Sequence, residues 1–440
     1  MSVMSSRGQA VDGKLRSWVT SANDPQGDFP IQNLPYGIRD GSVAVRIGET
    51  YVCLHEIVRA QAFEGELAAF AWAQSLTSGS LNAFACLPAT VLSEIRRQLV
   101  AIFAEGSAAR SKIEPLLRMV RENEGSEVLP FRVGDYSDFY ASLHHATNVG
   151  SMFRPTIPLL PNWKHVPIGY HGRASSIVPS GTSVVRPYGQ TVASDEGPPA
   201  FGPSKLMDYE LEVGFFVGAG NALGQPIPVD QAWKHIFGFV LVNDWSARDI
   251  QKWEYQPLGP FLAKNFATSV SLWVVTREAL EPFCVAGPPR APEDPQPLGY
   301  LADPHGCNVD VTLEVWIASA KMRADGTPPT LISRGSMSDM FWTPAQMLAH
   351  HASNGCNMQV GDLLASGTVS GTTKESRGCL LERTWRGTEP LMLGDGTERR
   401  FLQDGDEVIM RGYCEKAGYP RVGFGECRGI VRPAHTGAAS

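Results

Sequence analysis

The sequence predicts a β-rich α+β fold built from two structural units. Its 440 residues are more than one ordinary hydrophobic core holds, so we expect two domains, or one large domain with a smaller companion. The 44 glycines and 32 prolines favour tight turns and short strands over long helices. Hydrophobic residues make up 43% and charged residues 19% of the chain, a composition that is able to bury a core.

The first unit is predicted to span residues 1–128. Within it, residues 42–57 alternate between apolar and polar side chains, as two paired strands joined by a turn would. Apolar residues then recur at helical spacing from Leu92 to Phe103, which predicts an amphipathic helix. A second helical pattern follows at residues 113–120.

The second unit is predicted to span residues 129–440, because the polar stretch RENEGSEV just before it is typical of a hinge. Short strands bounded by glycine and proline dominate this unit, and they are expected at residues 206–217, 236–242, 271–275, 309–316, 407–410 and 422–424. The clearest helical pattern lies at residues 337–353.

Charge, hydropathy and cysteine spacing exclude several classes of protein. The net charge of -7 offers no basic surface for nucleic acid or for an anionic membrane. No stretch approaches the roughly eighteen apolar residues of a membrane span, and the first residues lack the apolar centre of a signal peptide. The eight cysteines contain no C-x-x-C pair, so we expect free thiols in a reducing compartment. A soluble, cytoplasmic protein is therefore expected.

Two glutamates, Glu210 and Glu212, are separated by one residue inside a predicted strand. On a strand such residues project from the same face about 7 Å apart, so both carboxylates can converge on one hard cation. An E-x-E pair is more often a solvated face. Here the apolar residues 215–217 favour burial, and buried carboxylates need a partner.

The segment after the next predicted strand carries further polar groups. Asp244 ends that strand, a position where ligands commonly collect. If the following residues form a helix, Arg248, Gln251 and Tyr255 share one face and offer a cation, an amide and a phenol to a small ligand. An ordinary amphipathic helix with its polar side in water is the alternative, but it does not explain why Lys264 has uncharged aromatic, glycine and proline neighbours.

A third polar segment, DYSDFYASLHHATNVGSMFR, mixes charged, aromatic and imidazole side chains. Asp138 can supply another oxygen ligand, and Arg154 can clamp a substrate carboxylate. Either His144 or His145 can act as a general base, since imidazole titrates nearest neutrality, and spacing alone does not choose between them. The chain has no G-x-S-x-G and no H-E-x-x-H, which disfavours common serine hydrolases and zincins.

Over nearly its whole length the chain resembles the fumarylacetoacetase family. The resemblance lies in SANDPQGDFPIQNLPYGI, DYSDFYASLHHATNVGSMFR, PNWKHVPIGYHGRASSI, the D-x-E-L-E strand, NDWSARDIQKWEYQPLGPF and GDLLASGTVSG, which occur in the family's order. It implies hydrolysis of 4-fumarylacetoacetate to fumarate and acetoacetate, the last step of tyrosine and phenylalanine catabolism. It also implies a homodimer that uses a divalent cation, with an N-terminal SH3-like β-barrel module and a C-terminal mixed β-roll domain.

The same resemblance implies roles for individual residues. The metal ligands would be Asp138, Glu210, Glu212 and Asp244, with Lys264 and Thr268 in a second cation site nearby. This oxygen-only shell suits Mg²⁺ or Ca²⁺.

The family's H-A-T-N sequence places the base at His145, and Glu382 would orient it. Arg248, Gln251 and Lys264 would supply the hydrogen-bonding field around the oxyanion and enolate. The dicarboxylate diketone substrate would be held by Tyr140, Arg154, Tyr170, Gln251, Tyr255 and Thr368.

Two other functions are possible for a chain with these residues. A related 1,3-dicarbonyl hydrolase of the wider superfamily, such as an acylpyruvase, or a decarboxylase is the nearest alternative, and the long N-terminal unit favours the first function over it. A metal-bound binding protein without catalysis predicts loss of the base, yet His145 and Glu382 are both present.

Overall fold

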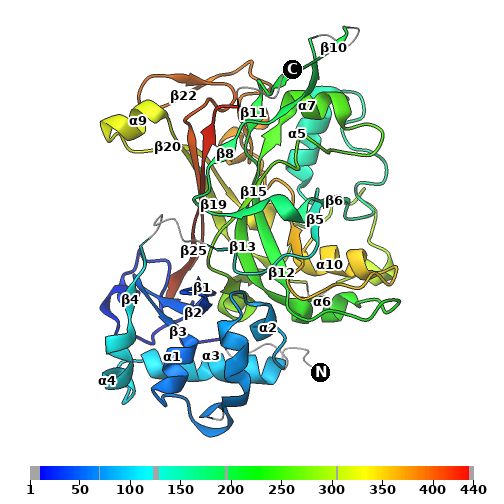
Figure 1. Cartoon of the computed structure of the whole chain (residues 1–440). Helices are drawn as coiled ribbons and strands as arrows, with labels where there is room; N and C mark the ends of the chain where they lie inside the picture. Colours follow the sequence, from blue (N-terminus) through cyan, green and yellow to red (C-terminus); the bar gives the residue numbers. More distant parts are fainter. Residues whose placement is uncertain (1–9, 69, 122–127, 194–196, 304–305, 436–440) are drawn as a thin grey trace.

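The computed structural model describes residues 10–68, 70–121, 128–193, 197–303 and 306–435. Figure 1 shows the N-terminal unit, in blue, at one end of a larger body built around two sheets. None of the helices formed by the described residues is both long enough and apolar enough to cross a membrane.

The N-terminal unit contains an antiparallel sheet in the order β1-β2-β3-β4. Its strands and helices are β1 (Tyr36–Arg39), β2 (Ser42–Ile47), β3 (Thr50–Cys53), α1 (Leu54–Arg59), α2 (Asn82–Ala85), α3 (Ala89–Phe103), α4 (Arg110–Ile113) and β4 (Arg118–Met119). The predicted strand pair at 42–57 and the helix from Leu92 to Phe103 are therefore confirmed. The sheet is open, so the SH3-like barrel stays a prediction.

The predicted helix at 113–120 is wrong. Helix α4 ends at Ile113, a single 3₁₀ turn containing Pro115 follows, and residues 118–119 pair with β3 as a strand. Proline has no amide hydrogen to continue a helix, which explains the change. The predicted hinge falls mostly on residues 122–127, outside the described residues. We keep the division at 128 and 129 as a proposal.

The central sheet has the order β6-β5-β21-β12-β13-β15-β7, with β16 also paired to β13. Its strands are β5 (Tyr136–Phe139), β6 (Gly169–Gly172), β7 (Ile177–Pro179), β12 (Leu211–Val217), β13 (Ile236–Asp244), β15 (Thr268–Val270), β16 (Val275–Thr276) and β21 (Leu363–Ala365). The expected strands at 206–217 and 236–242 match β12 and β13 of this sheet, and the start of the first forms a separate short strand, β11 (Met207–Asp208).

The predicted strand at 271–275 is wrong for most of its length. Strand β15 ends at Val270 and β16 starts only at Val275. Between them the chain leaves the central sheet, and Val274 exchanges backbone hydrogen bonds with Tyr36 of the N-terminal unit. Its apolar residues are buried against that unit, which is why they resemble a strand in the sequence.

A second sheet has the order β20-β19-β24-β25-β8 and packs against the central one. Its strands are β8 (Val184–Val185), β19 (Thr312–Ala318), β20 (Thr330–Ser336), β24 (Glu407–Lys416) and β25 (Tyr419–Arg432). The strands predicted at 309–316, 407–410 and 422–424 overlap these longer ones. Figure 1 shows β25 reaching from this sheet down to the N-terminal unit, where Asn33 donates to the carbonyl oxygen of Gly423.

The remaining elements are short. The helices are α5 (Leu143–Phe153), α6 (Val229–His235), α7 (Arg248–Glu254), α8 (Arg277–Leu280), α9 (Ala320–Asp325), α10 (Pro344–Ala352) and α11 (Leu380–Arg383). Two-stranded pairs are formed by β9 (Tyr188–Val192) with β10 (Pro199–Pro203), β11 (Met207–Asp208) with β14 (Ser246–Ala247), β17 (Cys284–Val285) with β18 (Asn308–Val309), and β22 (Leu391–Met392) with β23 (Glu398–Arg399). Helix α10 confirms the helical pattern predicted near residue 345.

The expectation that all cysteines are free thiols is wrong, because Cys284 and Cys307 form a disulfide. Strands β17 and β18 pair so that Cys284 lies opposite Val309, which brings the nearby Cys307 within reach. The 23-residue separation gives no sign of this in the sequence. The other cysteines are free.

The central sheet is buried on both faces. On β13, Phe239 and Leu241 join the core between the two sheets, whereas Val240 and Val242 join the core shared with the N-terminal unit. Because successive strand residues alternate between faces, Asp244 continues the row of Val240 and Val242. The acidic end of this row is where the candidate site lies.

Candidate active site

Three buried carboxylates meet at the ends of central strands. Asp138 comes from β5, Glu212 from β12 and Asp244 from the last position of β13. One oxygen of each lies within 4.8 Å of the others, and all three side chains are almost fully buried. We call these residues the carboxylate cluster.

Half of the carboxylate oxygens in the cluster are not satisfied by protein donors. Both oxygens of Glu212 and Oδ1 of Asp138 are buried without a hydrogen-bond partner among the described residues. Burial, followed by the charges of neighbouring carboxylates, raises the pKa of Glu212 and of Asp138 well above the usual range. Such a group of buried oxygens fits a hard divalent cation, which would supply the missing partner.

Glu210 is held differently from the cluster. Its carboxylate forms ion pairs with the guanidinium of Arg248, at 2.7 Å, and with the ammonium of Lys264. Burial alone would raise the pKa of Glu210, but the charges of Lys264 and Arg248 hold it below the usual range. Lys264 also pairs with Asp244, so its ammonium lies between two carboxylates. Thr268 lies at the same place, with Oγ1 donating to Asp244 over 3.4 Å.

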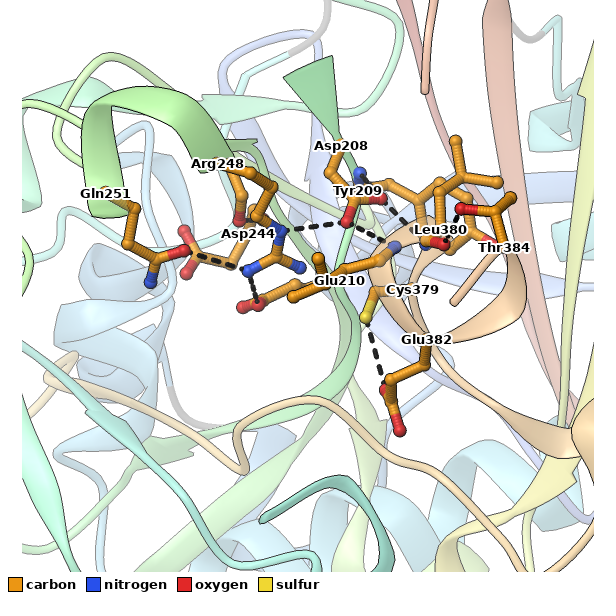
Figure 2. A network of polar contacts seen from close by, with 12 residues as sticks. Asp208, Tyr209, Glu210, Asp244, Arg248, Gln251, Cys379, Leu380, Glu382 and Thr384 are labelled. Atoms are coloured by element: carbon orange, nitrogen blue, oxygen red, sulfur yellow. Dashed lines mark hydrogen bonds and ion pairs between the residues drawn. The ribbon is translucent and has the colours of Figure 1, made fainter. Parts of the chain in front are cut away.

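Arg248 is fixed on three sides, as Figure 2 shows. Its Nε donates to Asp208 over 2.8 Å, and its Nη1 pairs with Glu210 and donates to Oε1 of Gln251 over 3.1 Å. The remaining nitrogen, Nη2, is buried and has no partner among the described residues. Arg248 begins helix α7, and Gln251, which it contacts, lies one turn later. The start of this helix thus presents one unused donor, Nη2 of Arg248.

A histidine and a glutamate form a buried pair next to this group. Nδ1 of His145, on α5, donates to Oε2 of Glu382, on α11, over 2.6 Å. Glu382 also accepts hydrogen bonds from Asn148, at 2.8 Å, and Ser370, at 2.8 Å, and from the thiol of Cys379 at 3.2 Å.

Glu382 is therefore ionised. Burial opposes this, but the charge of His145 and these hydrogen bonds lower the pKa of Glu382 to about 2. An ionised carboxylate only accepts, so the hydrogen lies on Nδ1 of His145, and in the neutral ring Nε2 keeps a lone pair. The hydrogen bond to Glu382 comes from His145 and not from its neighbour His144. The charge of His144 acts elsewhere, on Asp339, where it opposes the rise in pKa that burial causes.

Four of the six predicted substrate-holding residues lie at the centre of the site. The ring of Tyr140 stands edge-on to that of His145, with centroids 5.3 Å apart. The hydroxyl of Tyr170 donates to Asp244 over 3.4 Å. Oγ1 of Thr368 is buried without a partner among the described residues, and Gln251 contacts Arg248.

The other two lie further out. Arg154 follows the last residue of α5, and its Nη2 donates to the carbonyl oxygen of Pro158 over 3.2 Å, while its Nε has no partner among the described residues. Tyr255 follows the last residue of α7 and is 38% exposed. Tyr255 can therefore be reached from solvent more easily than the central four.

Comparisons with known proteins agree with this geometry. A family model described as fumarylacetoacetate (FAA) hydrolase C-terminal matches residues 136–432, and one described as fumarylacetoacetase N-terminal matches residues 32–124. The chain belongs to the fumarylacetoacetase family. This membership covers both structural units and supports a β-rich fold with an N-terminal domain.

Individual members of the family are similar over almost their full length. The fumarylacetoacetase of Bos taurus is 47% identical over 428 residues, 95% of this chain and 99% of that protein. The fumarylacetoacetase of Caenorhabditis elegans is 48% identical over 417 residues, 92% of this chain and 97% of that protein. A solved structure of a Mycobacterium smegmatis protein assigned as HpcE shares the fold, with a TM-score of 0.50 at 18% identity, over 91% of this chain and 99% of that one.

Sequence reasoning missed several residues of this fumarylacetoacetase-family site, the most important of which is Asp208. The carboxylate of Asp208 accepts the backbone N–H of Leu380 at 2.8 Å and of Leu381 at 2.9 Å, besides the bond from Arg248. Asp208 therefore joins Arg248 to the start of α11, which carries Glu382. It lies in the recognised D-x-E-L-E strand, but partners about 170 residues away leave no local signal. Asn148 was missed because its partner Glu382 lies 234 residues away, whereas Ser370 and Cys379 lie only 12 and 3 residues from Glu382 but have no spacing that signals the contact.

Proposed function

We propose that this protein hydrolyses the carbon-carbon bond of 4-fumarylacetoacetate, giving fumarate and acetoacetate at the end of tyrosine and phenylalanine catabolism. Its curated relatives at 47% and 48% identity are named fumarylacetoacetases. The observation that carries the proposal is the pairing of Glu382 with Nδ1 of His145, together with a buried carboxylate cluster in which Glu212 and one oxygen of Asp138 have no partner among the described residues. No comparable observation favours an acylpyruvase.

Asp138, Glu212 and Asp244 would hold the divalent cation, which we propose to be Mg²⁺ or Ca²⁺ because every available ligand atom is an oxygen. When bound, the cation supplies a Lewis acid that polarises the two carbonyl oxygens of the diketone. Glu210 would act as an outer ligand that also fixes Arg248 and Lys264. The second cation site near Lys264 and Thr268 stays a prediction.

His145 would act as the general base. Nε2 accepts a proton from water while Glu382 holds Nδ1 and stabilises the positive ring that results. The water oxygen adds to the carbonyl carbon next to the fumaryl double bond. The bond from that carbon to the methylene then breaks, and its electron pair leaves with acetoacetate as an enolate. His145 then gives the proton that it took from water to the enolate carbon, which completes acetoacetate.

Three donors would stabilise the charge that develops in this reaction. Arg248 offers its unpaired Nη2, and Lys264 and Gln251 surround the same region. These donors are already fixed by protein contacts, so they need little reorganisation when charge appears. Their arrangement also gives a role to Lys264, whose uncharged neighbours an ordinary amphipathic helix does not explain.

The substrate carries a carboxylate at each end, which Arg154, Tyr140, Tyr170, Tyr255 and Thr368 would recognise. A guanidinium can bind a carboxylate at two points, and Nε of Arg154 has no partner among the described residues. The exposed position of Tyr255 suits a residue that closes over bound substrate.

We also propose a homodimer located in the cytoplasm. Residues after α7 expose several large apolar side chains, led by Leu258 at 96% and Phe261 at 67%, and contacts between copies would cover them. For the cytoplasmic location, the six free cysteines favour a reducing compartment, whereas the Cys284–Cys307 disulfide is a feature more common outside one.

The experiment that tests the function is product analysis with two substrates in parallel. Mg²⁺-loaded protein is incubated with fumarylacetoacetate or with an acylpyruvate. Chromatography then quantifies fumarate and acetoacetate from the first substrate, and pyruvate and the matching carboxylic acid from the second. We expect fumarate and acetoacetate in equal amounts from the first substrate and slow or no turnover of the second. Preference for the acylpyruvate would overturn the proposal.

A further inference from the structure

We propose that His145, Cys379 and Glu382 form a second, inhibitory metal site that binds a soft or borderline divalent ion such as Zn²⁺ or Cd²⁺. The consequence for catalysis rests on the proposed function, in which His145 is the base. The site itself rests only on the three side chains, and we call it the thiol site.

The ligand atoms of the thiol site already lie together. A ring nitrogen, a thiol sulfur and a carboxylate oxygen lie within 4.8 Å of one another, and all three residues are buried. Cys379 immediately precedes α11 and Glu382 lies within it, so two ligands come from one turn of chain. Figure 2 shows the thiol pointing at the Glu382 carboxylate.

The spacing needs little adjustment to admit an ion. Nδ1 of His145 lies 2.6 Å from Oε2 of Glu382, and Sγ of Cys379 lies 3.2 Å from the same oxygen. Zinc sits about 2.0–2.3 Å from nitrogen, oxygen and sulfur ligands, which places the ligands themselves roughly 3–4 Å apart. The imidazole and carboxylate therefore have to separate slightly, while water can fill the fourth position.

The chemistry of the thiol site differs from that of the carboxylate cluster. Asp138, Glu212 and Asp244 offer oxygen alone, which suits Mg²⁺ and Ca²⁺. A set of sulfur, nitrogen and oxygen prefers zinc or cadmium, since thiolate is a soft ligand. Two kinds of ion can thus bind next to each other without competing for the same side chains.

A metal at the thiol site would remove the base by moving a proton. At present Nδ1 of His145 and the thiol of Cys379 each donate a hydrogen to Glu382. When the metal binds, the thiol proton is released to solvent, and the imidazole proton moves from Nδ1 to Nε2 because Nδ1 now binds the metal. Nε2 then has no lone pair with which to accept a proton from water. One proton leaves the protein for each ion bound.

The first test is competition between metals in the unmodified protein. Turnover of fumarylacetoacetate is measured in saturating Mg²⁺ while Zn²⁺ is titrated, and the titration is repeated at a much higher Mg²⁺ concentration. We expect the same zinc concentration for half-inhibition in both series. Relief in proportion to Mg²⁺ would place the zinc in the carboxylate cluster and overturn the proposal.

The second test replaces the soft ligand. Cys379→Ser keeps a hydrogen-bond donor to Glu382 but loses the thiolate, and Cys379→Ala is the alternative if the serine variant folds poorly. Normalised to each variant's own zinc-free rate, half-inhibition should need about tenfold more zinc or higher. The matched controls are Cys86→Ser and Cys356→Ser, free thiols away from the site, which should respond like the unmodified protein. Equal sensitivity of the Cys379 variants would contradict the proposal.

The third test does not depend on activity. Cadmium bound to thiolate absorbs in the ultraviolet, so Cd²⁺ is titrated into Mg²⁺-loaded protein carrying Cys86→Ser and Cys356→Ser. We expect the absorbance to saturate at one ion per chain with release of one proton, and both signals to disappear when Cys379→Ser is added. Absorbance and proton release that persist in the Cys379→Ser protein would overturn the thiol site. If both signals depend on Cys379 but the protein does not turn over fumarylacetoacetate, only the proposed function is overturned.

Discussion

At the scale of single residues, the two neighbouring histidines, His144 and His145, are expected to differ in function, because only His145 is proposed to act as the general base. His145 is held by Glu382, whereas the charge of His144 acts on Asp339. We expect His145→Ala to lower turnover by about 10²–10⁴-fold, the usual contribution of a general base. His144→Ala is the matched control and should cost far less.

Turnover is measured with both variants, together with thermal unfolding and Mg²⁺ affinity. His145→Ala should leave the fold and the Mg²⁺ affinity intact, with some loss of melting temperature because the buried Glu382 loses a partner. Equal losses of turnover from the two substitutions would show that the assignment of the base is wrong.

Glu212 allows a prediction in which a catalytic defect comes with higher stability. Its two carboxylate oxygens are buried without partners among the described residues, next to Asp138 and Asp244. Glu212→Gln removes the charge and adds donors for those neighbours, so the metal-free protein should melt at a higher temperature. The increase in melting temperature on adding Mg²⁺ should shrink, because a cation ligand is lost.

The control for Glu212 is Glu407→Gln. Glu407 is also buried, but it is paired with Arg428 at 2.9 Å, so losing its charge should lower stability. Thermal unfolding with and without Mg²⁺ checks both variants. Without metal, Glu212→Gln and Glu407→Gln should change the melting temperature in opposite directions. If both lower it by the same amount, our interpretation of the carboxylate cluster is wrong.

The sequence predicted part of this residue-level arrangement. The E-x-E spacing correctly indicated two buried carboxylates, but only Glu212 joins Asp138 and Asp244, whereas Glu210 is neutralised by Arg248 and Lys264. That difference depends on which cations the fold brings close, and Lys264 is 54 residues from Glu210. Local periodicity carries no such information.

At the scale of elements, α11 is too short to be stable without help. It has only four residues, and the Asp208 carboxylate accepts two of its first backbone N–H groups while also holding Arg248. Asp208→Asn leaves one fewer acceptor, so we expect a loss of about 1–3 kcal/mol in the free energy of unfolding. Turnover should fall by about tenfold or more, since both Arg248 and Glu382 lose their positions.

The matched control for Asp208 is Asp362→Asn. Asp362 likewise accepts two backbone N–H groups, from Gln359 at 2.7 Å and Asp135 at 3.2 Å, but touches no proposed catalytic residue. Urea unfolding and turnover are compared for both variants. Equal losses of turnover would mean that Asp208 acts only through general stability.

Asp362 also predicts a pH dependence of stability. Burial, opposed by its backbone hydrogen bonds, raises the pKa of Asp362 from the usual 3.8 to about 6. The folded state then binds this proton more tightly than the unfolded state, so stability from this group falls as pH rises from about 4 to about 6. The stability advantage of the unmodified protein over Asp362→Asn should therefore be largest near pH 4 and smaller at pH 7. Urea midpoints across this range measure it, and an advantage that grows with pH would contradict the shift.

The strands were predictable from the sequence where the same apolar residues are both buried and paired in a sheet. The continuous apolar runs of β12 and β13 were recognised, because strands buried on both faces need such runs. Residues 271–274 have a similar composition, yet they are buried against the N-terminal unit instead of pairing in the central sheet. Only the tertiary structure distinguishes these two ways of burying apolar residues.

At the scale of the whole molecule, the N-terminal unit covers one face of the central sheet. The sheet residues in this shared core are Tyr136, Ile177, Phe216, Phe237, Val240, Val242, Val270, Leu363 and Ala365. A fragment of residues 129–440 would expose them, so we expect it to aggregate or to bind a hydrophobic dye when expressed alone. Size-exclusion chromatography and dye fluorescence measure this, and a folded, active fragment would contradict the shared core.

The most direct test of the central claim follows the near-ultraviolet absorbance of fumarylacetoacetate with protein that has been depleted of metal. We predict that the absorbance stays constant with the depleted protein and falls once Mg²⁺ or Ca²⁺ is restored. Undiminished turnover by the depleted protein would show that the carboxylate cluster does not hold a required cation. No turnover by folded, Mg²⁺-loaded and Ca²⁺-loaded protein would contradict the proposed reaction itself.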